Sequence, residues 1–217
     1  MIAHDLKAPL SSIKGSLEIV KARGLISDEG YQRLLDNAQS AADFMLLMLN
    51  DMLDISQAQE TGLNPQKSEV KLGPLFVKLR ALFAGRCEKR EVELGFKTEE
   101  GLKSFVTDPN LLFRVLTNLI ANAVKISSRG QPVAVSAFRA GKLVRFTVAD
   151  AGPGVPEDQK ERIFEKYTSF TKRKPALEET GTGIGLAFCR LAAQALGGRV
   201  WVEDRPGGGS LFILELT

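Results

Sequence analysis

The chain changes its hydrophobic periodicity near residue 60, and this change limits the folds that it can adopt. Before that point, apolar side chains recur every three or four residues over 2–23 and again from about Ser27 to about Gln59, as on one face of an α-helix. Gly24 ends the first run, and a segment with Gly62 and Pro65 ends the second. The sequence therefore predicts a helical hairpin over residues 1–60 and a second domain over residues 61–217.

Two helices cannot cover both of these apolar faces by packing only against each other. The faces consist of Leu6, Leu10, Ile13, Leu17 and Val20 on the first helix and Leu34, Leu35, Ala38, Ala41, Met45, Leu49, Met52 and Ile55 on the second. A four-helix bundle formed by two chains would bury them. We therefore expect a homodimer through residues 1–60.

The second domain mixes helical and strand patterns. The patterns predict a strand over Glu69–Leu72, a helix over about Pro74–Lys89, a strand around Val92–Lys97, a helix starting at Asp108–Pro109, a hairpin of Pro132–Phe138 with Leu143–Ala149, and a hairpin of Arg199–Glu203 with Ser210–Leu216. Helices combined with a mostly antiparallel sheet make an α+β sandwich.

Composition excludes several classes of protein. The longest strongly apolar stretch, Phe44–Leu49, is far shorter than the ~20 residues that cross a bilayer, so we expect no membrane contact by this segment. The net charge is only +3 and the basic residues are scattered, apart from a short cluster at 172–174, so we expect no nucleic-acid partner. Cys87 and Cys189 lie far apart, which favours free thiols in a cytoplasmic protein.

His4 is the only histidine and therefore the only candidate for histidine chemistry. It is followed by Asp5, and a carboxylate beside an imidazole can fix the tautomer so that the other ring nitrogen acts as a nucleophile. A single histidine on a helix surface is more often inert. Its interpretation therefore depends on the second domain.

Two motifs of the second domain suit a metal-bound nucleotide. Asn118, Asn122 and Lys125 share one helix face, where amide oxygens can bind Mg²⁺ and the lysine can offset phosphate charge. A solvated polar face is the alternative. Asp150 ends a strand and could accept a hydrogen bond from an exocyclic amine, while glycines permit close approach of a flat base; a plain turn is the alternative. These glycines are Gly152 and Gly154.

A later glycine motif opens a helix, where free backbone N–H groups can hold phosphates. It comprises Gly181, Thr182, Gly183, Gly185 and Leu186. It does not follow a strand directly, which argues against a Rossmann dinucleotide site. The charged connection over about 156–180 predicts a flexible lid, and Gly207–Gly209 is most simply a structural turn.

In this order, the motifs resemble the catalytic core of a bacterial sensor histidine kinase over essentially the whole chain. The resemblance covers the H box at residues 4–10, the N box at 118–127, the first glycine box at 150–155, the F box at 164–167 and the second glycine box at 181–186. It implies a dimerisation and phosphotransfer hairpin followed by the GHKL (Bergerat) ATP-binding fold of type II topoisomerases and heat-shock chaperones.

The resemblance also implies a reaction and its partners. ATP with Mg²⁺ would bind the second domain, the γ-phosphate would pass to His4 with Asp5 as orienter or base, and an aspartate of a response regulator would receive it. The binding roles would be Mg²⁺ for Asn122, phosphates for Asn118 and Lys125, and the adenine amine for Asp150. We expect the sensor domain to lie outside this chain, in a protein that is either soluble or membrane-anchored.

Three positions depart from the family pattern. Ala8 stands where Thr or Asn usually orients the water of the phosphatase reaction, so we expect weak phosphatase activity. Ile126 replaces an aromatic residue or histidine, and Ser169 replaces a basic residue. These two favour the alternative of a catalytically weak, kinase-like ATP-binding scaffold. A water-activating ATPase would carry Glu where this chain has Asn118.

Overall fold

The computed structural model describes residues 62–166 and 183–217 and, between residues 13 and 53, the positions 13, 15, 17–20, 35–36, 38–39, 42–43, 45–46, 49–50 and 53. His4, Asp5 and Ala8 lie outside the described residues, as do Gly181 and Thr182. The architecture below therefore concerns mainly the second domain.

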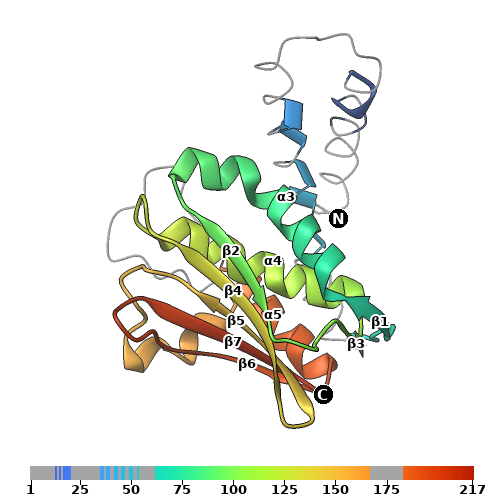
Figure 1. The fold of residues 1–217 in the computed structure, drawn as a ribbon, viewed down its shortest axis with the longest axis vertical. Helices are drawn as coiled ribbons and strands as arrows, with labels where there is room; N and C mark the ends of the chain where they lie inside the picture. The colour runs from blue at the N-terminus through green and yellow to red at the C-terminus, as the bar shows by residue number, and fades with distance from the viewer. Residues whose placement is uncertain are drawn as a thin grey trace.

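A five-stranded sheet forms one layer of the second domain, with strand order β2-β4-β5-β7-β6 (Figure 1). The strands are β2 (Leu94–Thr98), β4 (Val133–Ala140), β5 (Leu143–Ala149), β7 (Ser210–Leu216) and β6 (Arg199–Asp204). β2 runs parallel to β4 and the other neighbours are antiparallel. A separate antiparallel pair joins β1 (Ser68–Lys71) to β3 (Ser104–Thr107).

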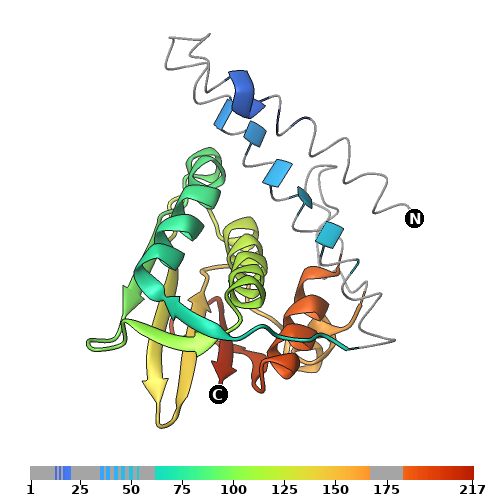
Figure 2. The same ribbon diagram turned by 90° about the vertical axis from the view of Figure 1, so that its right-hand side faces the viewer.

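Three helices lie side by side over one face of the sheet (Figure 2): α3 (Leu72–Arg90), α4 (Pro109–Ile126) and α5 (Gly185–Ala195). α4 is the central one and contacts both of the others. Its apolar stripe, which includes Leu112, Leu116 and Ile120, is completely buried. Burying one such side chain stabilises the folded domain by roughly 1.5–3 kcal/mol. The sheet and α4 therefore form the core together.

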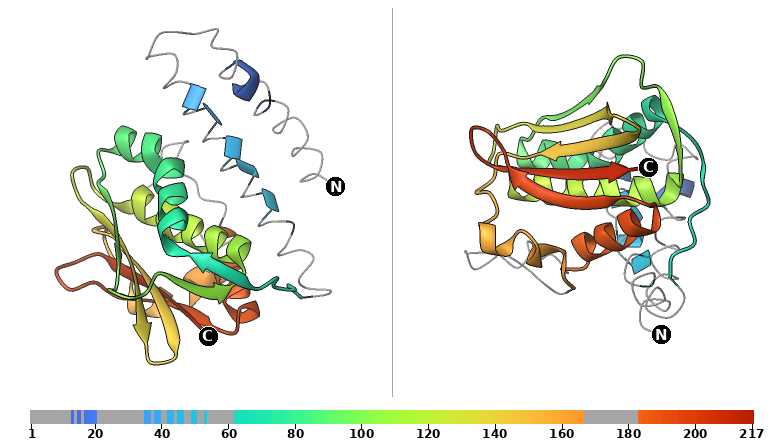
Figure 3. Two further views of the ribbon diagram at one scale, coloured as in Figure 1. Left: turned by 45° about the vertical axis from the view of Figure 1, so that its right-hand side comes forward. Right: turned by 90° about the horizontal axis from the view of Figure 1, so that it is seen from below.

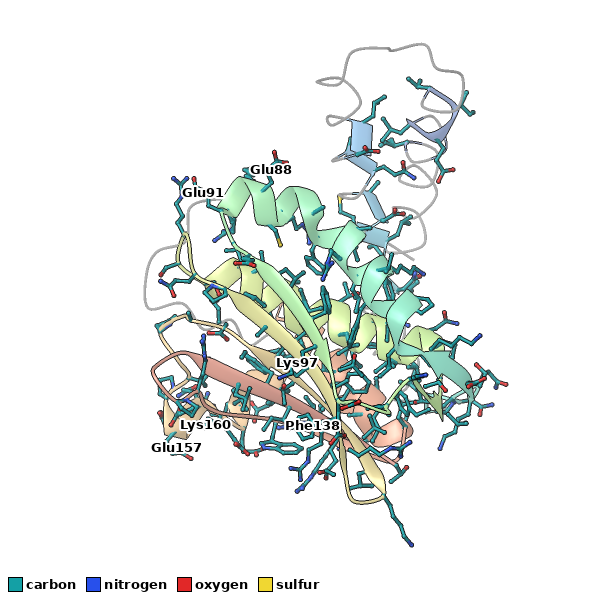
Figure 4. The ribbon with its side chains drawn as sticks, in the orientation of Figure 1. Glu88, Glu91, Lys97, Phe138, Glu157 and Lys160 are labelled. Carbon is teal, nitrogen blue, oxygen red and sulfur yellow. The ribbon has the colours of Figure 1, made fainter. Side chains whose placement is uncertain are left out.

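The opposite face of the sheet carries no helix in the described part of the chain (Figure 3). Phe138, labelled in Figure 4, alternates along β4 with the buried Val135 and Ala137 and so belongs to this outer face. There, Glu215 of β7 pairs with Arg145 of β5 at 2.5 Å and with Arg199 of β6 at 3.0 Å. These ion pairs link three neighbouring strands.

The predicted α+β sandwich is confirmed, and each predicted strand and helix of the second domain is present within a few residues of its expected bounds. Two features were missed. β3 was not predicted, because its four residues form a strand only by pairing with β1 about 35 residues earlier. The parallel pairing of β2 with β4 was also missed.

The expected lid over about 156–180 is wrong for its first residues. Glu157–Gln159 and Arg162–Phe164 form short 3₁₀ helices, η1 and η2. Ile163 and Phe164 are buried, because they pack against the domain core. The rest of the expected lid, from residue 167 to 180, lies outside the described residues.

The described positions of the first domain are helical in both predicted helices. The Gln39 side chain donates a hydrogen bond to Glu18 Oε1 at 3.2 Å, which brings the two segments side by side. Ala42 is buried, whereas Ile13 and Met45 are each 54% exposed although both belong to the predicted apolar faces. These faces are therefore not fully covered within one chain.

Asp108 fastens the start of the second domain to α4. Its Oδ1 accepts hydrogen bonds from the backbone N–H groups of Asn110 and Leu111, each at 2.9 Å, and so caps the helix. Its Oδ2 accepts from the backbone N–H of Gln66 at 2.6 Å. Leu63, which lies just before Gln66 in the sequence, packs against the core. The segment that follows residue 61 is therefore held to α4, the helix that bears Asn118.

Replacing Asp108 by Ala or by Asn should distinguish its role as a helix cap from its contact with Gln66. Asp108→Ala removes the helix cap and the Gln66 acceptor, and we expect the free energy of unfolding to fall by about 1–2 kcal/mol. Asp108→Asn keeps a good capping oxygen, so its loss should be clearly smaller. Urea denaturation of both variants measures the difference, and equal losses would contradict a stabilising role for the cap.

Candidate functional site

Asn118 occupies a buried position on α4, on the side that faces α5. Its side chain is 5% exposed, and its Nδ2 donates to the backbone carbonyl of Arg114 at 3.1 Å, one helical turn earlier. This bond orients the amide so that Oδ1 lies against the first residue of α5, Gly185. The N-box helix and the second glycine motif therefore meet at this amide.

Gly185 is needed at this contact for steric reasons. A Cβ atom there would lie 2.5 Å from Asn118 Oδ1, closer than carbon and oxygen atoms can approach. Gly183, two residues earlier, has a φ of 65°, which favours glycine. α5 has no side-chain cap at its N-terminus, so the N–H groups of its first turn are not taken by a capping side chain.

The other polar residues of the stripe follow on α4 at the next turns. Asn122 and Lys125 are both half-buried. The Lys125 backbone carbonyl accepts a hydrogen bond from Arg90 of α3 at 2.6 Å, which secures the last turn of α4. The structure thus keeps the predicted common face of Asn118, Asn122 and Lys125, with spacings of four and three residues on one regular helix.

Asp150 is completely buried immediately after β5. Its Oδ1 accepts hydrogen bonds from the backbone N–H groups of Gly152 at 2.8 Å and Ser210 at 3.1 Å. Its Oδ2 is buried and has no hydrogen-bond partner in the described part of the chain. Burial raises the pKa of this carboxyl group, although the two backbone donors, the Ser210 side chain and Arg205 act in the opposite direction.

Glycines surround Asp150 because backbone segments approach it closely. A Cβ at Gly152 would lie 3.0 Å from Asp150 Oδ1 and 3.1 Å from both Ile126 Cγ1 and the Ile126 carbonyl. A Cβ at Gly209 would lie 2.1 Å from the Asp150 carbonyl oxygen, and Gly209 also has a φ of 97°. Gly154, with a φ of 76°, adjoins the Gly209 carbonyl.

The turn between β6 and β7 therefore belongs to the site, which the sequence interpretation as a plain structural turn missed. Gly209 and Ser210 meet Asp150 directly, and Arg205 donates to the Asp150 carbonyl at 2.9 Å. The only signal in the sequence was the run of three glycines immediately before a strand. That signal is compatible with many hairpins.

The F-box residue Phe164 contacts both β7 and α5. Phe164 is 3% exposed and contacts Phe212 edge to face, with ring centroids 6.4 Å apart. The Arg190 guanidinium lies 5.2 Å from the centroid of the Phe164 ring and donates to both the carbonyl and the carboxylate of Glu161. Glu157 and Lys160, which Figure 4 labels, form an ion pair at 2.6 Å beside Asp204.

No cluster of three or more His, Cys, Asp or Glu side chains among the described residues could hold a metal ion by itself. Among the helices of this part of the chain, none has the length and apolarity needed to cross a bilayer.

Comparison with known families identifies the domain that carries this geometry. Residues 107–217 match the family model of the histidine kinase-, DNA gyrase B-, and HSP90-like ATPase. Residues 1–61 match the His Kinase A (phospho-acceptor) domain. The chain belongs to the sensor histidine kinases. This membership confirms the predicted GHKL type of the second domain.

Known sensor histidine kinases resemble the chain over its full length. The adaptive-response sensory kinase SasA of Nostoc sp. is 32% identical over 100% of this chain and 55% of its own length. The sensor histidine kinase AruS of Pseudomonas aeruginosa is 32% identical over 99% of this chain and 22% of its own length. The chain thus spans about half or less of these curated relatives.

A solved structure has a similar fold. The crystal structure of full-length ShkA in complex with AMPPNP superposes with a TM-score of 0.70 at 26% sequence identity. The match covers 99% of this chain and 44% of ShkA.

Two glycines of the β6–β7 turn provide a matched test of the contact with Asp150. Gly207 and Gly209 have similar φ values of 89° and 97°, but only Gly209 has a neighbour that a Cβ would meet. Both Ala variants should lose about 1 kcal/mol or more of unfolding free energy from the left-handed backbone. Gly209→Ala should lose clearly more and should also weaken nucleotide binding. Urea denaturation and a nucleotide titration measure the two effects, and equal behaviour of the variants would contradict the steric argument.

Proposed function

We propose that this chain is the catalytic core of a protein-histidine kinase that transfers the γ-phosphate of ATP to His4. The observation that carries the proposal is the buried Asp150 carboxylate at the end of β5, whose Oδ2 has no hydrogen-bond partner among the described residues. A buried acceptor without a partner is costly, so a ligand that donates a hydrogen bond there gains affinity. The 6-amino group of adenine is such a donor.

This acceptor also favours ATP over GTP. Guanine carries a carbonyl oxygen at position 6, which would place two acceptors opposite each other in a buried site. Leaving buried polar groups unpaired typically costs about 1–3 kcal/mol.

The phosphates would lie between α4 and the start of α5. Asn118 and Lys125 would contact them, together with the N–H groups of Gly183 and Gly185 and of the preceding Gly181 and Thr182; Leu186 continues this motif into α5. Helix N-termini favour anions because their amides and dipole present positive charge. This arrangement fits a triphosphate better than a neutral ligand.

Mg²⁺ would be held by Asn122. An amide oxygen is a hard ligand that suits this ion, which usually keeps several waters and takes its remaining ligands from phosphate oxygens. The absence of a carboxylate cluster in the described residues is consistent with a metal that arrives with the nucleotide. When bound, Mg²⁺ would neutralise part of the phosphate charge, which phosphoryl transfer requires.

His4 and Asp5 would carry the chemical step. A ring nitrogen of His4 attacks the γ-phosphorus, a P–N bond forms, and the bond from phosphorus to the leaving oxygen of ADP breaks. Asp5 accepts the hydrogen bond of the other ring N–H and so orients the imidazole or takes up its proton. These two roles are supported by the family membership of residues 1–61.

The partners follow from the same family. The exposed Ile13 and Met45 support a homodimer through residues 1–60, since a second copy would cover the open apolar faces. The phosphate would pass to an aspartate in the receiver domain of a response regulator. We place the core in the cytoplasm, within a protein that is either soluble or anchored in the membrane.

His4→Gln tests the proposal directly. Incubation with γ-labelled ATP should give an acid-labile, base-stable label on the wild type and no label on the variant, because the sequence has no other histidine. The variant should bind nucleotide as tightly as the wild type, which serves as the control. A wild type that binds ATP but takes up no label would instead support the kinase-like scaffold. The aliphatic Ile126 beside Gly152 is the described feature that favours this alternative.

Ala8 predicts the balance between kinase and phosphatase. Without a hydroxyl or amide to orient water, the core should dephosphorylate its phosphorylated response regulator slowly in the presence of ADP. Ala8→Thr should accelerate this reaction several-fold and leave labelling of His4 unchanged. Loss of phosphate from the labelled regulator measures both rates, and rapid dephosphorylation by the wild type would refute the prediction.

A further inference from the structure

Arg205 lies in the β6–β7 turn with its side chain directed to Asp150. The residue is half-buried, and its Nη1 donates to the Asp150 backbone carbonyl at 2.9 Å. Its own backbone is fixed on both sides, because Arg205 N–H donates to the Gly209 carbonyl at 3.1 Å and Gly208 N–H donates to the Arg205 carbonyl at 3.0 Å. A hydrogen-bonded turn therefore holds the Arg205 guanidinium beside Asp150.

This turn and Ser210, the first residue of β7, contact each polar atom of Asp150 except Oδ2. The Asp150 N–H donates to the Ser210 carbonyl at 3.0 Å, and Ser210 N–H donates to Asp150 Oδ1 at 3.1 Å. The Arg205 guanidinium donates to the Asp150 carbonyl, against which the backbone of Gly209 also packs. The atom that remains is Oδ2, which has no hydrogen-bond partner among the described residues.

We propose that Arg205 is a positioning residue for the nucleotide base, which acts by holding Asp150 so that Oδ2 meets the 6-amino group of adenine. This inference rests on the proposed nucleotide function but assigns a role to a residue outside the N box and the glycine boxes. Arg205 is not a catalytic residue, since its partner is the residue that touches the base.

Electrostatics supports the same role. Burial raises the pKa of Asp150, and the positive charge of Arg205 opposes that shift. Arg205 is the charged side chain that acts on this carboxyl group within the described residues. The residues that meet the Asp150 turn from the end of α4, Ile126 and Ser127, are uncharged. Loss of the guanidinium should therefore raise the pKa further.

The sign of the pH effect follows from this change. The carboxylate accepts the amine hydrogen bond, and its protonation weakens adenine binding as the pH falls through the pKa of Asp150. A higher pKa moves this loss of affinity to a higher pH. The acid limb of nucleotide binding should thus shift upward when Arg205 loses its charge.

Three variants separate the contributions of charge and hydrogen bonding. Arg205→Met removes both, Arg205→Gln keeps an N–H donor without the charge, and Arg205→Lys keeps the charge on a differently shaped donor. Arg139→Met is the matched control, because Arg139 is an exposed residue of β4 and its loss changes the net charge equally. Urea denaturation of each variant checks that the domain remains folded.

The probes are ADP and IDP, titrated into the full chain over a pH series. IDP carries an oxygen in place of the 6-amino group and so reports on the contact with Asp150. We expect Arg205→Met to weaken ADP binding about tenfold, which corresponds to ~1.4 kcal/mol, and to change IDP binding much less. Its acid limb should move to higher pH. Arg205→Gln should share that pH shift, and Arg139→Met should behave as the wild type.

Equal losses for ADP and IDP, or an unchanged pH profile in Arg205→Met, would overturn the inference and leave Arg205 with a structural role only. A wild type that binds ADP with the expected pH profile but never labels His4 would refute the kinase proposal alone.

Discussion

The burial of the Asp150 carboxylate is the constraint on which the nucleotide site depends. A buried, charged group needs hydrogen-bond partners, and here they come from two separate backbone segments, the turn after β5 and the turn between β6 and β7. Both segments must approach closely, which explains why Gly152 and Gly209 have no side chain. One oxygen is left without a partner in the described chain, and in our proposal this oxygen accepts the hydrogen bond of the adenine amine.

The helix α4 both forms part of the hydrophobic core and carries the polar residues of the site. Its apolar face is buried between the sheet and its neighbouring helices, while its polar face carries Asn118, Asn122 and Lys125. Because Asp108 both caps this helix and holds the backbone of Gln66, the segment following the histidine-bearing domain is attached to the helix that would bind phosphate.

Much of the second domain could be predicted because its elements have strong local signals. The Asp108–Pro109 start of α4, the Ala140–Gly141 turn and the alternating strands are all encoded within short windows. The failures concern contacts between distant segments. β3 is a strand only because β1 lies beside it, and Phe164, which the sequence assigned to a flexible lid, packs against Phe212. Neither contact leaves a periodic signal.

By itself, the sequence determined the order of the motifs, the shared face of Asn118, Asn122 and Lys125, and His4 as the sole candidate phosphoacceptor. Helical spacing fixes the first two within one element, and composition fixes the third. Only the tertiary structure decided that Arg205, Gly209 and Ser210 surround Asp150. These residues are 55–60 positions away, and they meet Asp150 because β7 pairs with β5. Strand order depends on how the whole sheet packs under its helices, which hydrophobic periodicity does not encode.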